Sequence, residues 1–154
     1  MQRRLAFLMV MLMASSALWA ESKSAVLTFP AGAATKESLH RAGTELLRRT
    51  GYTLDASVPE KEIRASVTYY DAINTGGSGT APSTLSWVLE IKAEQDGRIV
   101  VTFRHEAQGH RPPEDVPLFA QNLTVGAGAS SAKALLTYQG ETKPLREWKQ
   151  QSAH

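Results

Sequence analysis

The architecture of this chain is specified above all by LSWVLEIKAEQDGRIVVTFR, residues 85–104. Apolar and polar residues alternate on both sides of Asp96-Gly97, which is the two-residue period of a half-buried strand. An Asp-Gly pair between two alternating segments is a strong signal for a hairpin turn. The stretch therefore predicts two antiparallel strands with one apolar and one polar face.

The length of the turn is set by the requirement that the apolar residues of both strands lie on the same face. A two-residue loop would place the apolar residues of the two strands on opposite faces, because a slip of one residue exchanges the faces. A three-residue loop, Gln95 to Gly97, removes this conflict and requires Gly97 in a left-handed conformation. It pairs Glu94 with Arg98, Ile91 with Val101, Leu89 with Phe103 and Trp87 with His105. The core face then holds Trp87, Leu89, Ile91, Ile99, Val101 and Phe103, and the opposite face, our candidate interaction surface, holds Val88, Glu90, Lys92, Val100, Thr102 and Arg104.

The segment from Thr35 to Thr50 predicts the main helix. Its apolar residues recur at helical spacing and form one stripe. Thr35 suits the N-cap, Arg48 and Arg49 suit the last turn, and Gly51 follows where a left-handed cap is favoured. We expect this helix to cover the apolar face of the sheet.

Other segments complete the expected architecture. Short strands are predicted from Ala25 to Phe29 and from Ile63 to Asp71, and a Gly, Ser, Thr and Pro loop from Asn74 to Ser83. A short helix is expected within 116–123, and Ser130 or Ser131 is expected to cap another through Leu136. The fold class is α+β, with a mixed or mostly antiparallel sheet of four to five strands and one main helix packed on one face. The expected organisation is a signal peptide, 1–20, a single α+β domain, 21–138, and a polar C-terminal tail, 139–154. Packing of Leu145 and Trp148 back onto the domain, which their three-residue spacing allows, is the alternative for the tail.

The first twenty residues have the pattern of a secretory signal peptide. Arg3 and Arg4 precede an apolar run, and small residues lead to Ala20. Cleavage before Glu21 is expected, with cleavage after Ala17 as the alternative. Retention as a signal anchor is a further alternative, although the run is shorter than the ~20 residues of a membrane span. We therefore expect export to the periplasm and no membrane span once the signal is removed.

Charge and cysteine content exclude several function classes. Loss of Arg3 and Arg4 leaves 15 basic residues against 15 acidic ones, so the cationic excess of a nucleic-acid-binding protein is missing. The chain contains no cysteine, which excludes a disulfide, a thiol nucleophile and a cysteine lipid anchor. We expect a partner protein, no nucleic acid and no cofactor.

Three patterns invite a catalytic interpretation. His105, Glu106 and His110 resemble a zinc-protease motif, but the histidines are five residues apart instead of four and Gly109 interrupts the helix that the motif needs. The segment 128–132 is a loose relative of a nucleophile elbow, and its serines are better read as caps. Tyr69, Tyr70 and Trp87 suggest a stacking surface, although aromatic residues on strands commonly serve packing. We expect no enzymatic activity, no catalytic residues and no metal ligands.

One part of the chain resembles a known family. The residues Thr28-Phe29-Pro30-Ala31-Gly32, then Glu37-Ser38-Leu39, Leu46-Leu47 and Thr50 to Leu54, are similar to the opening strand, helix and strand of the small periplasmic N-terminal module of secretins, TonB-dependent receptors and certain pilus or conjugation proteins. The hairpin that follows is more similar to small envelope-assembly accessory proteins with a strand-helix-strand-strand plan. Both resemblances imply a non-enzymatic protein that docks onto other envelope proteins.

The sequence therefore predicts an exported periplasmic accessory protein, acting by protein contact in a secretion, pilus or outer-membrane assembly. A periplasmic inhibitor or immunity protein is the alternative. A metal-dependent hydrolase built on His105, Glu106 and His110 is the second alternative.

Overall fold

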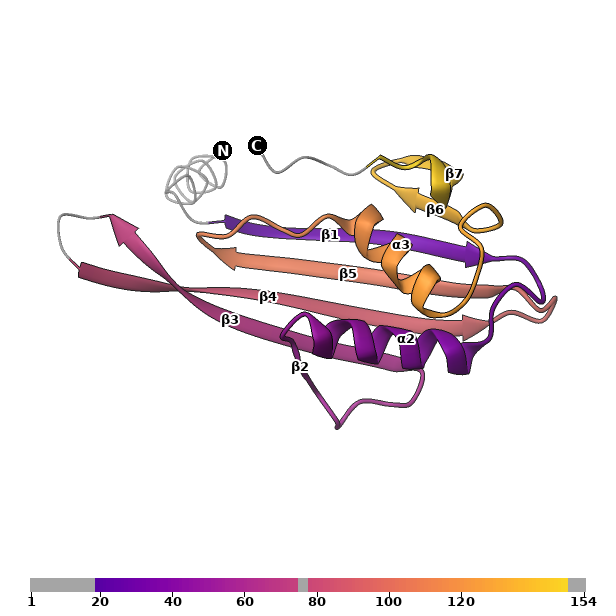
Figure 1. Ribbon diagram of the computed structural model, residues 1–154, viewed down its shortest axis with the longest axis horizontal. Coiled ribbons are helices and arrows are strands. Elements are labelled where there is room, and N and C mark those ends of the chain that lie inside the picture. The colour runs from indigo at the N-terminus through magenta and orange to yellow at the C-terminus, as the bar shows by residue number, and fades with distance from the viewer. Residues whose placement is uncertain (1–18, 75–77, 150–154) are drawn as a thin grey trace, which may run out of the picture.

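The computed structural model describes residues 19–74 and 78–149 and contains one antiparallel sheet with two α-helices (Figure 1). All seven strands belong to the sheet, in the order β2-β3-β4-β5-β1-β6-β7. The elements in chain order are β1 (Trp19–Phe29), α2 (Lys36–Arg49), β2 (Thr53–Leu54), β3 (Glu62–Asn74), β4 (Ser78–Ala93), β5 (Ile99–Gly109), α3 (Val116–Gly126), β6 (Leu135–Tyr138), β7 (Glu141–Pro144) and a short 3-10 helix, Leu145–Glu147. The α+β class is confirmed, whereas the expected four to five strands and one main helix are corrected to seven strands and two α-helices within the described residues.

The hairpin of β4 and β5 has the predicted register. Trp87 pairs with His105, Leu89 with Phe103 and Ile91 with Val101. The Glu94 N–H donates to the Arg98 carbonyl oxygen at 2.8 Å, which closes the three-residue loop. Gly97 has a φ of +90°, the left-handed conformation that this loop requires. The six predicted core residues of the hairpin are all buried.

Helix α2 begins and ends as its capping residues predict. The Thr35 side chain accepts a hydrogen bond from the Ser38 N–H at 3.1 Å, and the Ser38 side chain completes a capping box. At the other end Gly51 has a φ of +95°, and the Tyr52 N–H donates to the Leu47 carbonyl oxygen at 2.9 Å. These bonds satisfy backbone groups that a helix end leaves free.

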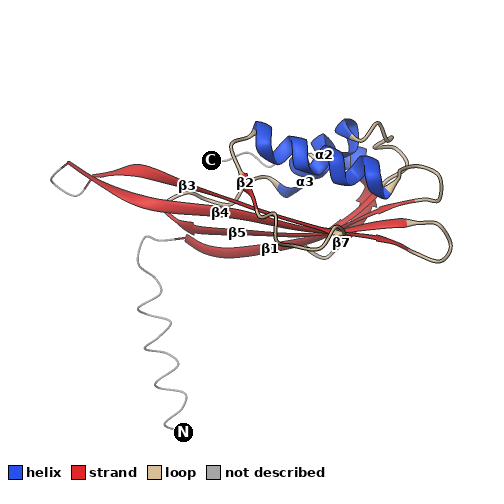
Figure 2. Cartoon of the chain, turned by 90° about the horizontal axis from the view of Figure 1, so that it is seen from below, coloured by secondary structure: helices blue, strands red, loops and turns tan. Residues whose placement is uncertain are grey.

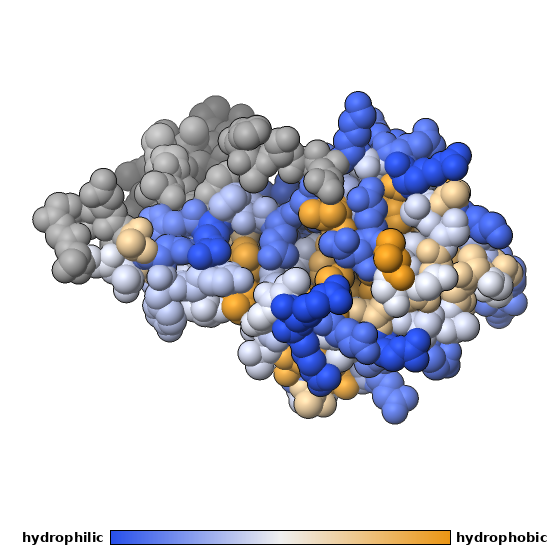
Figure 3. All heavy atoms as spheres, viewed as in Figure 1, coloured by the Kyte–Doolittle hydropathy of each residue, from blue (hydrophilic) through white to orange (hydrophobic). Residues whose placement is uncertain are grey.

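Both helices lie on the same face of the sheet (Figure 2). Gly43 lets α2 approach the sheet closely, because a Cβ there would lie 2.9 Å from Ile63 Cδ1 and 3.5 Å from Leu123 Cδ1 of α3. The core between the helices and the sheet includes the largest fully buried side chains of the described residues, among them Trp87, Phe29 and Phe103. Figure 3 views the helix side, where hydrophobic residues show only as separate patches among hydrophilic ones. The opposite face of the sheet is called the outer face below.

Three sequence expectations about element boundaries are wrong. Strand β1 begins at Trp19 instead of Ala25, because β5 runs to Gly109 and pairs with it along its whole length. The expected helix capped by Ser130 or Ser131 is absent, and residues 135–138 form β6 beside β1. The expected polar tail, 139–154, contains β7, and its Leu145 and Trp148 are buried. The remainder of the expected leader, residues 1–18, lies outside the described residues.

The expected loop from Asn74 to Ser83 is also corrected. Strand β3 continues to Asn74 and β4 begins at Ser78, with the two strands paired throughout. Residues 69–74 of β3 and 78–83 of β4 extend beyond the end of β5, and we call this two-stranded extension the arm (Figure 1). The arm lies outside the helix layer, so its strands do not need the apolar residues that mark a strand in sequence.

No helix in residues 19–74 and 78–149 is long and apolar enough to cross a membrane.

Candidate functional site

The outer face of the sheet carries all six residues of the candidate interaction surface. Strand alternation directs Val88, Glu90 and Lys92 of β4 away from the helices, because their neighbours Trp87, Leu89 and Ile91 are buried. The same alternation places Val100, Thr102 and Arg104 of β5 on the outer face. Neither of the two described α-helices, α2 and α3, covers this face (Figure 2).

Strands β1 and β6 add residues to this surface that the hairpin alone does not reveal. Thr28 of β1 lies between Val100 of β5 and Leu135 of β6. Val26 of β1 pairs with Thr102. We call Val26, Thr28, Val100, Thr102 and Leu135 the central patch. Leu135 is 45% exposed and is one of the large hydrophobic residues that the core leaves at the surface.

Charged residues of the outer face are neutralised within their own strands. Arg64 Nε lies 2.8 Å from the Glu62 carboxylate, and the Lys92 amine lies 3.7 Å from that of Glu90. Arg104 is paired with Glu106 at 3.5 Å. Side chains two residues apart on a strand share a face, so these pairs all form on the outer face. The resulting surface has an apolar and threonine-rich centre and a charged surround with no net excess of either sign.

The helix side of the same strands holds an aromatic stack. The Trp87 ring lies between Phe119 of α3, at a centroid distance of 3.9 Å, and His105, at 4.2 Å. The Trp87 N–H donates to the Glu114 carboxylate at 3.1 Å. No described residue forms a hydrogen bond with the buried Tyr52 hydroxyl, and burial, followed by the nearby Glu114 charge, raises the pKa of Tyr52. The stack joins α3 to the sheet.

His105 is a structural residue in this stack. Its Nδ1 lies 2.8 Å from the Ser86 carbonyl oxygen, which can only accept, and its Nε2 lies 2.8 Å from the Glu114 N–H, which can only donate. The ring is therefore neutral, with the proton on Nδ1. Burial lowers the pKa of His105, in agreement with these partners.

The zinc-protease resemblance does not correspond to a common site. His105 is fully buried, and both of its ring nitrogens are occupied by the backbone. Glu106 points to the outer face and is paired with Arg104. His110 is exposed beyond the end of β5. Among the described residues, no group of three or more His, Cys, Asp or Glu side chains is placed to hold a metal ion.

The aromatic residues Tyr69, Tyr70 and Trp87 do not form one surface. Trp87 is fully buried, whereas Tyr70 is 73% exposed and points to the outer face. Tyr69 lies on the helix side of β3, and the Arg111 guanidinium is 3.7 Å from its ring centroid. Ser130 and Ser131 lie in the connection before β6, where the Ser130 side chain accepts from the Ala132 N–H at 3.2 Å.

The base of the arm holds an ordered site that the sequence does not indicate. Arg111, in the segment after β5, binds the Asp71 carboxylate of β3 through Nε and Nη2, each at 2.9 Å. Hydrogen bonds from Arg111 and then from Ser83 lower the pKa of Asp71. The Ser83 hydroxyl accepts from the His110 N–H at 2.9 Å. No local pattern indicates this site, because Asp71 and Arg111 are 40 residues apart in sequence.

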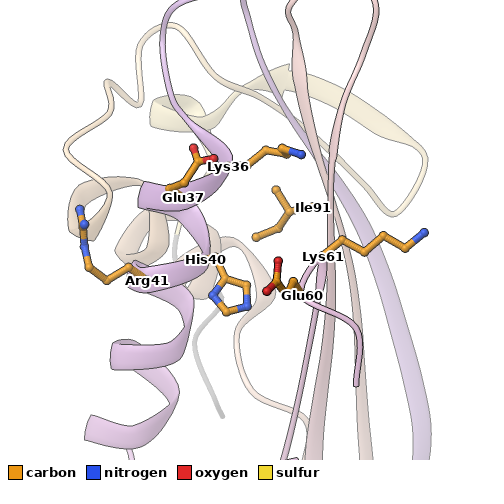
Figure 4. Close-up of a pocket in the computed structure, with 7 residues that line it drawn as sticks. All are labelled: Lys36, Glu37, His40, Arg41, Glu60, Lys61 and Ile91. Atoms are coloured by element: carbon orange, nitrogen blue, oxygen red, sulfur yellow. The ribbon is translucent and has the colours of Figure 1, made fainter. Parts of the chain in front are cut away.

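A surface hollow of about 540 Å³ lies at the start of α2. Figure 4 shows side chains of α2 on one side, those of the segment before β3 on the other and Ile91 between them. The lining residues are Lys36, Glu37, His40, Arg41, Glu60, Lys61 and Ile91. Its charges are of both signs and largely exposed, so the hollow selects no particular class of ligand.

Comparisons with known proteins identify no family. No family model matches the chain, and no curated protein matches it. The chain is similar to a solved structure of a DUF4468 family protein from Bacteroides ovatus ATCC 8483, with 11% identity and a TM-score of 0.27. The match covers 85% of this chain and 61% of that one, so this chain spans less than two thirds of the length of that protein. A likeness at this level supports no statement about function.

Proposed function

We propose that this chain is an exported protein that docks onto another protein of the bacterial envelope, as an accessory to a secretion, pilus or outer-membrane assembly. The outer face of the sheet is the docking surface, and its central patch is the part that contacts the partner. The leader pattern before Glu21 supports export. The resemblance of residues 28–54 to periplasmic docking modules supports the kind of partner.

The central patch is the observation that carries this proposal. Protein interfaces combine an apolar centre with a polar rim, and charged residues are depleted at the centre. The outer face has this arrangement, with Val26, Val100 and Leu135 at its centre and the pairs Glu90-Lys92 and Arg104-Glu106 around them. Because the rim charges are already paired, they do not oppose a partner of either sign. A partner with a similarly neutral, partly apolar surface fits this face best.

Site-specific crosslinking in intact cells tests the proposal. A photoreactive amino acid at Thr102, an exposed position of the central patch, should capture a single envelope protein. The same amino acid at Glu45, an exposed position of α2, is the matched control and should give no such product. Equal products from both positions, or none from Thr102, would contradict docking through the outer face.

A second measurement tests the compartment and the class of partner. Cell fractionation should recover the chain from the periplasm, with an N-terminus near Glu21 by intact mass. An envelope component as the captured partner supports the accessory role. Capture of one soluble hydrolase or toxin instead would support the inhibitor alternative, and recovery from the cytoplasm would contradict both.

A further inference from the structure

The arm has one backbone edge that nothing in the described residues covers. Strand β2 pairs with β3 only at Ser66 and Ala65. Beyond Ser66, β3 continues to Asn74 with β4 on one side, and none of the described strands lies on the other. Figure 1 shows this part of β3 extending past the helices and past β5.

The backbone groups that point out of this edge can be identified. In an antiparallel ladder the N–H and C=O of one residue point to the same side, and successive residues alternate. The Asp55 N–H donates to the Arg64 carbonyl oxygen at 2.8 Å, so Arg64 faces β2. Lys61 faces the opposite way, because its carbonyl oxygen accepts from the Ile91 N–H of β4 at 2.9 Å. Residues that follow Arg64 by an even number therefore direct their N–H and C=O groups out of the open edge. These residues are Thr68, Tyr70 and Ala72.

The two edges of the arm differ in their protection. On β4, Pro82 lies opposite Tyr70 and faces the side where β5 has ended. Proline has no N–H, and it is a common device against pairing at a sheet edge. Residues Thr68 to Ala72 of β3 include no proline and a single charge, Asp71, which Arg111 neutralises. Of the two described edges of the arm, only the β4 edge is protected by a proline against pairing with another strand.

We propose that a second copy of this chain pairs with this edge, antiparallel strand to antiparallel strand, through a two-fold axis at Tyr70. Tyr70 then faces Tyr70 of the other copy, and Thr68 faces Ala72 in both directions. All three residues present a donor and an acceptor, so the contact forms roughly six backbone hydrogen bonds and joins the two sheets into one. The exposed Tyr70 rings lie beside one another across the axis on the outer face.

Symmetry and charge both indicate a second copy of the chain as the partner at this edge. A two-fold contact requires a surface that complements itself. This edge does so, because its outward-facing residues Thr68, Tyr70 and Ala72 are uncharged, and the one charge between Thr68 and Ala72, Asp71, is paired with Arg111. An edge that selected a foreign peptide by charge would carry an excess of one sign, which is missing here.

Cysteine crosslinking tests the register, since the chain contains no cysteine of its own. In Tyr70→Cys the two Cα atoms lie about 5.5 Å apart across the axis, within the range that a disulfide spans. In Thr68→Cys the two copies of the residue are offset by four positions, roughly 13 Å along the strand, and cannot form one. The same holds for Ala72→Cys alone, whereas a mixture of Thr68→Cys and Ala72→Cys should crosslink. Equal crosslinking of all three single variants, or none of Tyr70→Cys, would overturn the proposal.

Sedimentation of the purified full chain tests the association without a covalent bond. The unmodified protein should be a dimer that dissociates on dilution. Ala72→Pro should be monomeric at the same concentration, because it removes an outward N–H without removing a β3–β4 hydrogen bond. A wild-type protein that stays monomeric into the millimolar range would overturn the proposal. Thr102→Arg on the central patch should leave the dimer intact, so this inference can fail or succeed independently of docking through the outer face.

Discussion

Replacing Gly109 with Ala tests how the base of the arm is held. Gly109 ends β5 with a φ of +112°, a conformation that residues with a Cβ rarely adopt. A Cβ at this position would lie 2.5 Å from the Pro82 carbonyl oxygen and 2.7 Å from Ser83 Cα. Both are backbone contacts, so β4 must move to accommodate the methyl group. We therefore expect Gly109→Ala to destabilise the protein and to loosen the arm.

The magnitude follows from comparison with Gly140. Gly140 also has a positive φ, +79°, but a Cβ there would have no heavy atom within 4 Å. Gly140→Ala thus incurs only the left-handed backbone cost, about 1 kcal/mol after the gain from a less flexible unfolded chain. Gly109→Ala adds a shift of about 0.8 Å to reach an ordinary carbon–oxygen separation. Such a shift breaks the bond between the His110 N–H and the buried Ser83 hydroxyl, which costs about 1–3 kcal/mol more.

Urea unfolding of the two variants measures this difference. We expect Gly109→Ala to lose about 3 kcal/mol of unfolding free energy and Gly140→Ala about 1 kcal/mol. Amide hydrogen exchange should also show a local loss of protection at Tyr69, Asp71, Ala81 and Ser83, whose N–H groups lie between β3 and β4, for Gly109→Ala alone. Equal destabilisation of the two variants, or unchanged protection of the arm, would refute the argument that backbone collision makes Gly109 necessary.

Two further predictions concern the hairpin and the aromatic stack. Gly97→Val should reduce the free energy of unfolding by about 1–2 kcal/mol, because valine must adopt a left-handed φ and its Cβ would lie 3.0 Å from that of Ala31. Chemical denaturation measures this loss, and an unchanged midpoint would contradict the prediction. Burial lowers the pKa of His105 in the folded state, so the unfolded chain takes up a proton more readily. The folded state is therefore favoured while His105 is neutral in both states, and this stability should be complete above pH ~6.5. It should decline as the pH falls, by at most about 1.4 kcal/mol per pH unit. Unfolding measured from pH 7.5 to pH 5 should show this slope in the wild type and in His110→Gln, and a smaller slope in His105→Gln; the same slope in all three proteins would exclude His105 as its source.

Local patterns were sufficient for the hairpin and for the main helix. Alternation along β4 and β5 places the candidate surface residues on one face, and the need to match the two apolar faces fixes the three-residue loop at Gly97. Thr35 and Gly51 mark the ends of α2, because capping depends on bonds to residues only a few positions away. These are the parts of the fold whose deciding interactions are close in sequence.

Distant pairing decided the parts that the sequence did not reveal. The polar segments Trp19 to Ser24 and 78–83 form strands because β5 and β3 lie beside them, and not because of their own composition. Strand β6 forms because it pairs with β1, and β7 forms because it pairs with β6. Burial of Leu145 and Trp148 in the core holds the end of this segment in place.

The amino-acid pattern alone was enough to predict which residues of one hairpin face away from the core, because side-chain direction alternates along any strand. The neighbours of these residues depend on how the whole chain folds. Folding brought Val26, Thr28 and Leu135 beside Val100, joined Arg111 to Asp71, and left one edge of β3 open while Pro82 blocks the other edge of the arm. Strand pairing and ion pairing join residues that are distant in sequence, so no local pattern encodes which neighbour each residue finds.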